Sequence, residues 1–137
     1  MRRKSIARRA VAIKPIGVVE SSLTDPADAP NQGDRGAPNA WLLFNREVRE
    51  AMSDLKVGDQ IIVLTWLHRA KRDVLRTYPG NQRRAPHLGV FSLRSPDRPN
   101  PIGLHPVKVL EVADLRIRVN HMEAIDGTPI VDVKPVI

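Results

Sequence analysis

The sequence predicts a mainly β protein, either a β-barrel or a curled sheet, with one short helix and long loops. Three observations lead to this class. Short runs rich in Val, Ile and Leu recur along the chain, separated by turns that contain Gly, Pro, Asp and Asn. Only one segment has the spacing of an amphipathic helix. Two intervals between the apolar runs are long and rich in polar residues and proline, which is typical of functional loops.

The expected strands coincide with the apolar runs. Residues 60–67 form a continuous apolar run, which is typical of a central strand. In 114–123, Leu115, Ile117 and Val119 alternate with polar residues, which predicts one apolar and one polar face. Gly17 favours a bulge in the first strand. The expected strands are residues 13–22, 40–44, 60–67, 88–93, 104–112, 114–123 and, after a turn at 126–127, the remainder of the chain to residue 137.

One helix is expected directly after the strand at 40–44. Asn45 can cap its first turn, and four apolar side chains recur at helical spacing on one face. These side chains belong to Val48, Ala51, Met52 and Leu55. The opposite face is charged, and a turn at 56–59 ends the segment, which therefore predicts a short amphipathic helix.

The chain has 137 residues, which suits one domain with a modest core. We expect a basic tail at 1–12 and a single β-barrel domain at 13–137, with no extra C-terminal domain. The absence of cysteine excludes disulfides, thiolate zinc sites and a cysteine nucleophile, and it favours a reducing cytoplasm. No apolar stretch approaches the roughly 20 residues that span a bilayer, so no membrane partner is expected.

The formal net charge of the chain is +7. A basic surface attracts polyanions, of which RNA and DNA are the commonest in a cytoplasm, although the same charge could serve solubility alone. Much of the charge lies in the tail and in the long segment 68–87, where basic side chains surround Tyr78. The basic residues of that segment are Arg69, Lys71, Arg72, Arg76, Arg83 and Arg84.

The segment GVFSLRSPDRPNPIG, residues 89–103, combines stiffness with positive charge. Pro96, Pro99 and Pro101 fix their own φ angles and keep the residue before each of them out of the helical region. Arg94 and Arg98 are therefore presented with little entropy left to lose, and guanidinium groups suit carboxylates and phosphates. The closing glycine permits a turn or the close approach of a ligand. An ordinary proline-rich crossover between strands is the alternative.

A second stretch that can carry chemistry is DGTPIVDVKP, residues 126–135. Asp126 begins a turn, and Asp132 and Lys134 lie on one face of a strand. Such a pair most often forms a simple salt bridge, although beside a ligand it could orient or polarise that ligand. His68 ends an apolar strand, and the other histidines show no metal-ligand spacing, so no metal site is expected. P-loop and Rossmann fingerprints are absent from the sequence.

Together these two stretches resemble the signatures of the TrmO (YaeB, TsaA-like) family, in the same order and at a similar separation. With Gln32 in the first long loop and the strand that ends in His68, the resemblance covers about residues 13–135. Asn31 and Val136 stand where that family usually has arginine and tyrosine. The resemblance implies a single-sheet β-barrel that acts as a homodimer. It also implies an S-adenosyl-L-methionine-dependent methyltransferase, whose acceptor is the exocyclic amine of threonylcarbamoyladenosine next to the tRNA anticodon.

The resemblance also implies which residues form the site. Cofactor contacts are expected from Asn31, Gln32, Gly33, His68, Arg69, Arg94, Leu104, Asn120, His121, Met122 and Glu123. Candidate catalytic residues are Arg94, Asp126 and Lys134, with Asp132 in their neighbourhood. RNA phosphates are expected to meet Arg69, Lys71, Arg72, Arg83 and Arg84.

Three functions remain open on these grounds. The leading one is a tRNA methyltransferase, which the basic segment 68–87 and the resemblance both favour. The second is a methyltransferase of another acceptor, such as a small metabolite. The third is a cofactor-binding or RNA-binding module without catalytic activity.

Overall fold

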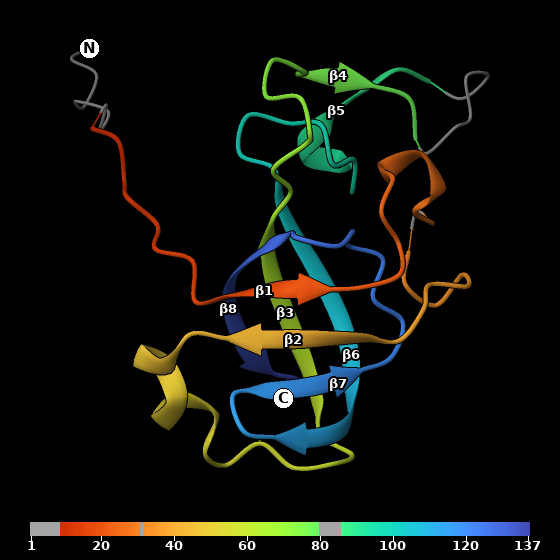
Figure 1. Cartoon of the computed structure of the whole chain (residues 1–137). Helices are drawn as coiled ribbons and strands as arrows, with labels where there is room; N and C mark the ends of the chain where they lie inside the picture. The colour runs from red at the N-terminus through yellow and green to blue at the C-terminus, as the bar shows by residue number, and fades with distance from the viewer. Residues whose placement is uncertain (1–8, 31, 80–85) are drawn as a thin grey trace.

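The computed structural model describes residues 9–30, 32–79 and 86–137, and this part of the chain is mainly β, as expected (Figure 1). Its strands are β1 (Gly17–Glu20), β2 (Ala40–Phe44), β3 (Gln60–Trp66), β4 (Arg76–Thr77), β5 (Leu88–Gly89), β6 (Ile102–Ala113), β7 (Arg116–Val119) and β8 (Pro129–Pro135). Its helical segments are three short 3₁₀-helices, η1 (Pro26–Asp28), η2 (Arg46–Met52) and η3 (Val90–Ser92).

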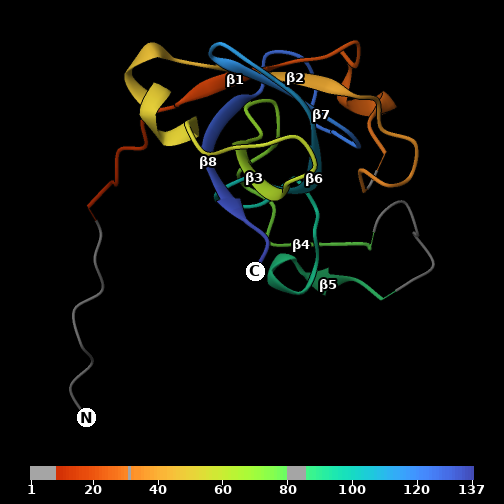
Figure 2. The ribbon, with the colours of Figure 1, turned by 90° about the horizontal axis from the view of Figure 1, so that it is seen from below.

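Six of these strands form one closed sheet. They pair in the order β1-β2-β7-β6-β3-β8, and β8 pairs back with β1, so the strands form a closed barrel (Figure 2). All the pairings are antiparallel. The remaining strands, β4 and β5, form a separate two-stranded sheet beyond one end of the barrel, so the expectation of a single sheet was incomplete.

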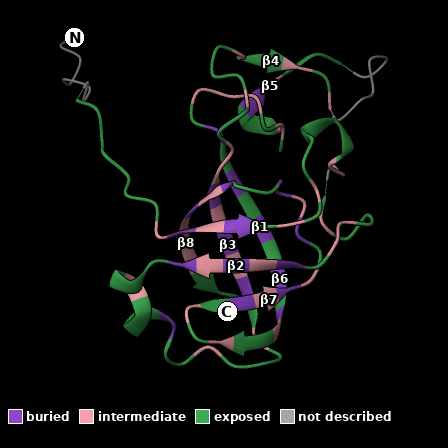
Figure 3. Ribbon diagram, viewed as in Figure 1, coloured by how far each residue is buried: buried purple, intermediate pink, exposed green. Residues whose placement is uncertain are grey.

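The core fills the inside of the barrel (Figure 3). Alternate residues of β3 and β6 point inward, and the register sets Ile61 opposite Val107 and Val63 opposite His105. Aliphatic side chains from the other barrel strands complete the cluster, and full burial of each such side chain stabilises the fold by about 1.5–3 kcal/mol. The side chains that are almost inaccessible to solvent include Leu42, Val109, Ile117, Met122 and Ile130.

The expected helix exists, but it is a 3₁₀-helix of seven residues. Its hydrogen bonds run from residue i+3 to residue i, as from the Val48 amide to the Asn45 carbonyl. Asn45 does not cap it, because its side-chain amide donates instead to the carbonyl of Pro15 at 3.1 Å. Only Met52 of this segment is buried, so little packing energy favours a longer α-helix between the ends of β2 and β3.

Three predicted strands are much shorter in the structure, and the one predicted at 114–123 is reduced to β7 at Arg116–Val119. The first begins at Gly17, and the four preceding residues 13–16 are irregular. The strand predicted at 88–93 keeps only Leu88 and Gly89 before the chain turns into η3. This turn exposes 89% of Phe91, so the apolar run there does not mark a buried strand. The Val90 carbonyl accepts hydrogen bonds from the Leu93 amide and from Arg98, and these bonds hold the turn.

The long connections all join strand ends at one rim of the barrel, which we call the loop rim. They are 21–39 between β1 and β2, 67–101 between β3 and β6, and 120–128 between β7 and β8. The antiparallel register places these strand ends together, since Glu20 lies opposite Trp41 and Ala40 lies opposite Val119. The opposite rim carries η2 and the tight turn between β6 and β7 (Figure 1). Most residues predicted for function therefore share one end of the molecule.

Gly17 is required for close strand packing, not for a bulge. The β1–β2 register is regular, whereas the irregular positions lie between Leu64 and Thr65 in the β3–β8 pairing and between Val109 and Glu111 in β6. A Cβ atom at Gly17 would lie 2.1 Å from the Leu43 carbonyl oxygen.

We expect Gly17→Ala to lower the free energy of unfolding by roughly 1–3 kcal/mol, because backbone atoms must move to admit the methyl group. Urea denaturation followed by circular dichroism measures the change. Gly89→Ala is the matched control, since the nearest atom to its Cβ would be 3.9 Å away. Equal unfolding midpoints for the two variants would contradict the packing argument.

Candidate functional site

The loop rim brings together segments that are far apart in the sequence. Asp126 joins the 120–128 connection to the first long loop, because its carboxylate accepts from the Ser21 amide at 3.0 Å and its own amide donates to the Leu23 carbonyl. The Met122 amide donates to the carbonyl of Pro38. These bonds place the predicted residues of both connections side by side.

The closest approach at this rim involves Gly33. A Cβ atom there would lie 1.9 Å from the His121 carbonyl oxygen and 2.8 Å from Glu123 Oε2, so only glycine fits without movement of a loop. His121 adopts a left-handed φ of 48°, which few residues other than glycine adopt without strain. The two loops are thus held in contact where the sequence predicted a shared ligand site.

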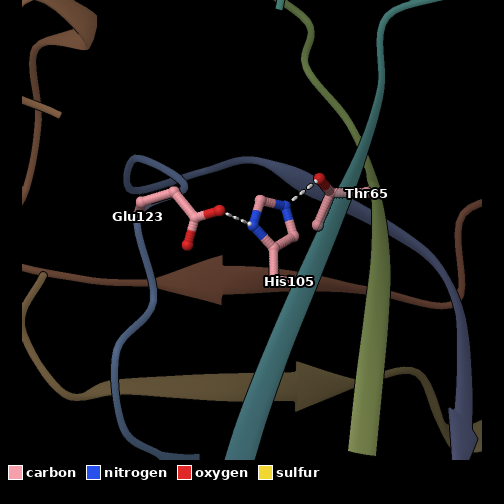
Figure 4. A network of polar contacts seen from close by, with 3 residues as sticks. All are labelled: Thr65, His105 and Glu123. Atoms are coloured by element: carbon pink, nitrogen blue, oxygen red, sulfur yellow. Dashed lines mark hydrogen bonds and ion pairs between the residues drawn. The ribbon is translucent and has the colours of Figure 1, made fainter. Parts of the chain in front are cut away.

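A buried polar network supports the 120–128 connection from inside the barrel (Figure 4). The Thr65 hydroxyl lies 2.6 Å from His105 Nε2, and His105 Nδ1 lies 2.7 Å from Glu123 Oε1. Thr65 and His105 are almost inaccessible to solvent, at 0% and 2% exposure. Glu123 Oε2 is also buried and has no hydrogen-bond partner among the described residues. A sheltered carboxylate oxygen in this state can accept a hydrogen bond from a ligand.

Sequence reasoning found Glu123 but missed Thr65 and His105. His105 is one of the histidines that show no metal-ligand spacing. One signal was available: His105 shares the inward face of its strand with Val107 and Val109, so it is a polar residue in an apolar series. The glycine that closes the proline-rich segment also has a different role from the one expected. A Cβ at Gly103 would lie 2.3 Å from Thr65 Oγ1, so this glycine makes room for the network and not for a turn.

The proline-rich segment is braced by one of its own arginines. The guanidinium group of Arg98 donates to three backbone carbonyl groups, those of Val90, Leu93 and Ser95, at 2.8–3.0 Å. Arg94, in contrast, is exposed to solvent. The stiffness predicted from the prolines is therefore reinforced by Arg98, and the charge available to a ligand is that of Arg94.

Some of the basic residues predicted to meet RNA contact the protein itself. Arg72 donates to the Pro99 carbonyl at 2.7 Å and stacks over Trp66, with its guanidinium carbon 5.1 Å from the ring centroid. Arg69 donates to the Thr24 carbonyl at 3.2 Å, and Lys71 is exposed. Arg83 and Arg84, like Asn31 of the predicted cofactor loop, lie outside the described residues.

Four of the predicted residues either lie away from the rim or direct their side chains to other parts of the protein. Lys134 pairs with Asp132 at 3.5 Å on the surface of β8, and its strand partner is Ile62, near the opposite end of β3. The Met122 side chain belongs to the hydrophobic core. Asn120 accepts a hydrogen bond from the Lys108 amide at 2.8 Å and so joins the end of β7 to β6.

The other predicted residues lie at or near the rim, in the three connections or at strand ends. They are Gln32, Gly33, His68, Arg69, Arg94, Leu104, His121, Glu123 and Asp126. Within residues 9–30, 32–79 and 86–137, no three His, Asp or Glu side chains cluster as metal ligands would. In the same ranges no helix has the length and apolar character needed to cross a membrane.

Residues 18–137 match the family model of the tRNA-methyltransferase O (TrmO) N-terminal domain. The chain belongs to this family. It is 41% identical to a probable S-adenosyl-L-methionine-binding protein of Methanothermobacter thermautotrophicus, over 91% of this chain and 89% of the relative. It is 40% identical to an S-adenosyl-L-methionine-binding protein of Archaeoglobus fulgidus, over 89% of this chain and 86% of the relative.

Crystal structures of TrmO share this fold. The TrmO of Pseudomonas aeruginosa superimposes with a TM-score of 0.76 at 25% identity, over 97% of this chain. The chain spans 57% of that TrmO chain. The resemblance to the TrmO family that the two signatures carry is thereby confirmed.

Arg98→Ala should lower the free energy of unfolding by roughly 1–3 kcal/mol, because it removes the charge-assisted bonds to three backbone carbonyl groups. Hydrogen exchange of residues 89–103 should speed up by a larger factor than exchange in β7. The exposed Arg94→Ala variant is the control and should leave both quantities unchanged. Equal effects of the two substitutions would refute the bracing role of Arg98.

Gly33→Ala should separate the first long loop from the 120–128 connection, because the added methyl group overlaps the His121 carbonyl. We expect NMR shifts of the amides in 120–123 to change while those of η2 stay in place. Asp34→Ala, at the exposed neighbouring residue, is the matched control. Unchanged shifts in 120–123 would show that the two loops do not touch in solution.

Proposed function

We propose that this protein is an S-adenosyl-L-methionine-dependent methyltransferase, and that its acceptor is the exocyclic amine of threonylcarbamoyladenosine next to the tRNA anticodon. The observation that carries the proposal is the buried Oε2 of Glu123 beside Gly33 at the loop rim, which has no hydrogen-bond partner within residues 9–30, 32–79 and 86–137. The family, and relatives that are S-adenosyl-L-methionine-binding proteins, support the cofactor.

The chemistry of the donor set fits this cofactor. A carboxylate oxygen that is sheltered from water and unpartnered accepts hydrogen bonds, and S-adenosyl-L-methionine offers an ammonium group and two ribose hydroxyls as donors. Arg94 is exposed on a rigid segment and suits a carboxylate, either that of the methionine moiety or that of the threonyl group of the acceptor. Gln32, His68 and the backbone of His121 complete the proposed set of contacts.

The chain's own residues have mainly a positioning task. The cofactor supplies an electrophilic methyl group on its sulfonium, and methyl transfer needs that group in line with the acceptor nitrogen. The acceptor N–H belongs to a urea-like group and is more acidic than the amine of plain adenosine, so a strong general base is unnecessary. Asp126, fixed by its bond from the Ser21 amide, can accept a hydrogen bond from the acceptor amine. Lys134 has no part in this proposal because it lies far along β8.

Binding of tRNA would draw on the net charge of +7 and on basic residues near the rim, with Lys71 and Arg69 the nearest described candidates. The exposed Leu75, Leu88 and Phe91 around β4, β5 and η3 suit a second copy of the chain, which supports the proposed homodimer. A tRNA substrate also favours a cytoplasmic location.

A second candidate function is methylation of a smaller acceptor. It is favoured by the internal use of Arg72, whose guanidinium is tied to Pro99 and Asn100 and so is less available to a phosphate. Incubation with total tRNA from a strain that lacks the methylation, followed by mass spectrometry of the nucleosides, separates the two candidates. A methylated threonylcarbamoyladenosine supports the first function. Cofactor binding without any change in the tRNA supports the second.

Arg94→Ala should weaken cofactor binding or methyl transfer at least 10-fold, because it removes the proposed partner of a ligand carboxylate. Calorimetric titration gives the first quantity and the nucleoside assay gives the second. Arg46→Ala, an exposed arginine of η2 at the opposite rim, is the control for lost positive charge. If Arg94→Ala keeps both wild-type affinity and turnover, Arg94 has no role in the site.

A further inference from the structure

We propose that His105 is a positioning residue, which holds Glu123 so that its second carboxylate oxygen is directed at the bound ligand, and that Thr65 holds the imidazole in place. This inference rests on the proposed function, because it concerns the same site. It assigns roles to Thr65 and His105, which lie on barrel strands and not in the rim loops.

The contacts define a chain of support from the barrel interior to the rim. Thr65 is on β3, His105 is on the neighbouring strand β6, and Glu123 is in the connection between β7 and β8 (Figure 4). An ionised carboxylate can only accept, so His105 Nδ1 must carry the proton in its 2.7 Å contact with Glu123. In the neutral imidazole Nε2 then accepts from the Thr65 hydroxyl at 2.6 Å. Each ring nitrogen has one partner, and the tautomer and ring orientation are both set.

The order of these groups matches the nucleophile–base–acid arrangement of serine hydrolases, but that chemistry is excluded here by burial. A nucleophile must reach its substrate, and Thr65 is 0% exposed. The member of this network nearest the loops is Glu123, and 16% of its side chain is exposed. Its Oε2 is buried against Gly33, so a ligand reaches this oxygen only when that loop residue gives way. In this network the buried pair, Thr65 and His105, therefore fixes the position of Glu123 at the rim.

Two glycines keep this arrangement in place. The space that a Cβ at Gly103 would need is occupied by Thr65 Oγ1 and by His105 Nε2, at 2.3 and 2.5 Å. Gly33 lies against Glu123 Oε2, since a Cβ atom at this glycine would be 2.8 Å from that oxygen. The free oxygen is thus confined on one side by the imidazole bond and on the other by the first long loop. Figure 4 shows it pointing away from the imidazole.

Substitution of His105 by two different amides separates the two halves of the network. An asparagine amide reaches the position of Nδ1, so His105→Asn retains a donor to Glu123. A glutamine amide reaches the position of Nε2, so His105→Gln retains the contact with Thr65 and leaves Glu123 unsupported. Each variant keeps one of the two buried hydrogen bonds, so we expect their stabilities to be alike, which thermal melting checks.

Calorimetric titration with S-adenosyl-L-methionine is the readout. We expect His105→Gln to bind roughly 10- to 100-fold more weakly than wild type, the size expected for loss of a hydrogen bond to a charged group. His105→Asn should recover at least 5-fold of that loss. In a Glu123→Gln background, the difference between the two amides should vanish. Equal losses for both variants at equal stability, or a difference that persists without the Glu123 carboxylate, would overturn the proposal.

Two further outcomes are informative. If the wild-type protein does not bind S-adenosyl-L-methionine, the proposed function fails and this inference fails with it. If the His105 variants do not fold, Thr65→Val and Thr65→Ser answer the question, since valine keeps the shape and removes the hydroxyl while serine keeps the hydroxyl. We expect Thr65→Val to bind at least 3-fold more weakly than Thr65→Ser, and equal affinities would count against the role of the network.

Discussion

β3 pairs with β6 along its whole length, from Gln60 opposite Lys108 to Trp66 opposite Ile102. The buried part of the site depends on this register. It places Thr65 opposite Gly103 and sets His105 within the barrel, where it meets the hydroxyl of Thr65. Because side chains alternate across a strand, a slip of one residue would turn these polar side chains outward. It would also move the apolar side chains on the same face of the strand out of the core. The barrel thus determines where the rim loops are anchored.

The rim itself is organised by polar contacts more than by apolar packing. Asp126 joins two connections, Arg98 braces the proline-rich segment, and Arg72 joins the chain after β3 to that same segment. Loops of this length carry many backbone groups that need partners, and side chains supply them here. A loop that is held by fixed side chains has less conformational freedom to lose when a ligand binds.

Much of the fold could be predicted from the sequence where the pattern was strong. The run at 40–44 is β2 with the predicted bounds, and the run at 60–67 is β3 to within one residue. The prediction of a strand at 88–93 was wrong beyond Gly89. There the Val90 carbonyl accepts a hydrogen bond from Arg98, and the local sequence pattern does not reveal this contact. The predicted site residues in the loops do gather at one rim. Lys134 lies away from this rim, because it pairs with Ile62 near the other end of β3, and the sequence does not show this pairing.

The network around His105 was beyond sequence reasoning for the same reason. Its members come from positions 65, 105 and 123, and only the register of two strands and the fold of one loop brings them together. Nothing in the spacing of these residues along the chain indicates that they meet. Gly103 stands out in the sequence as the residue that closes the proline-rich segment, but a turn and the close approach of a ligand explain it equally well.

The space around Gly103 has a consequence for how this protein can vary or be redesigned. Residues 65, 103 and 105 share one small volume inside the barrel. A larger residue at any of them requires a smaller one at another, so the three positions must change as a set. A signature glycine next to a surface loop thus limits the choice of side chains on two strands. Any attempt to alter what the rim binds by repacking beneath it has to treat these three positions as a single design variable.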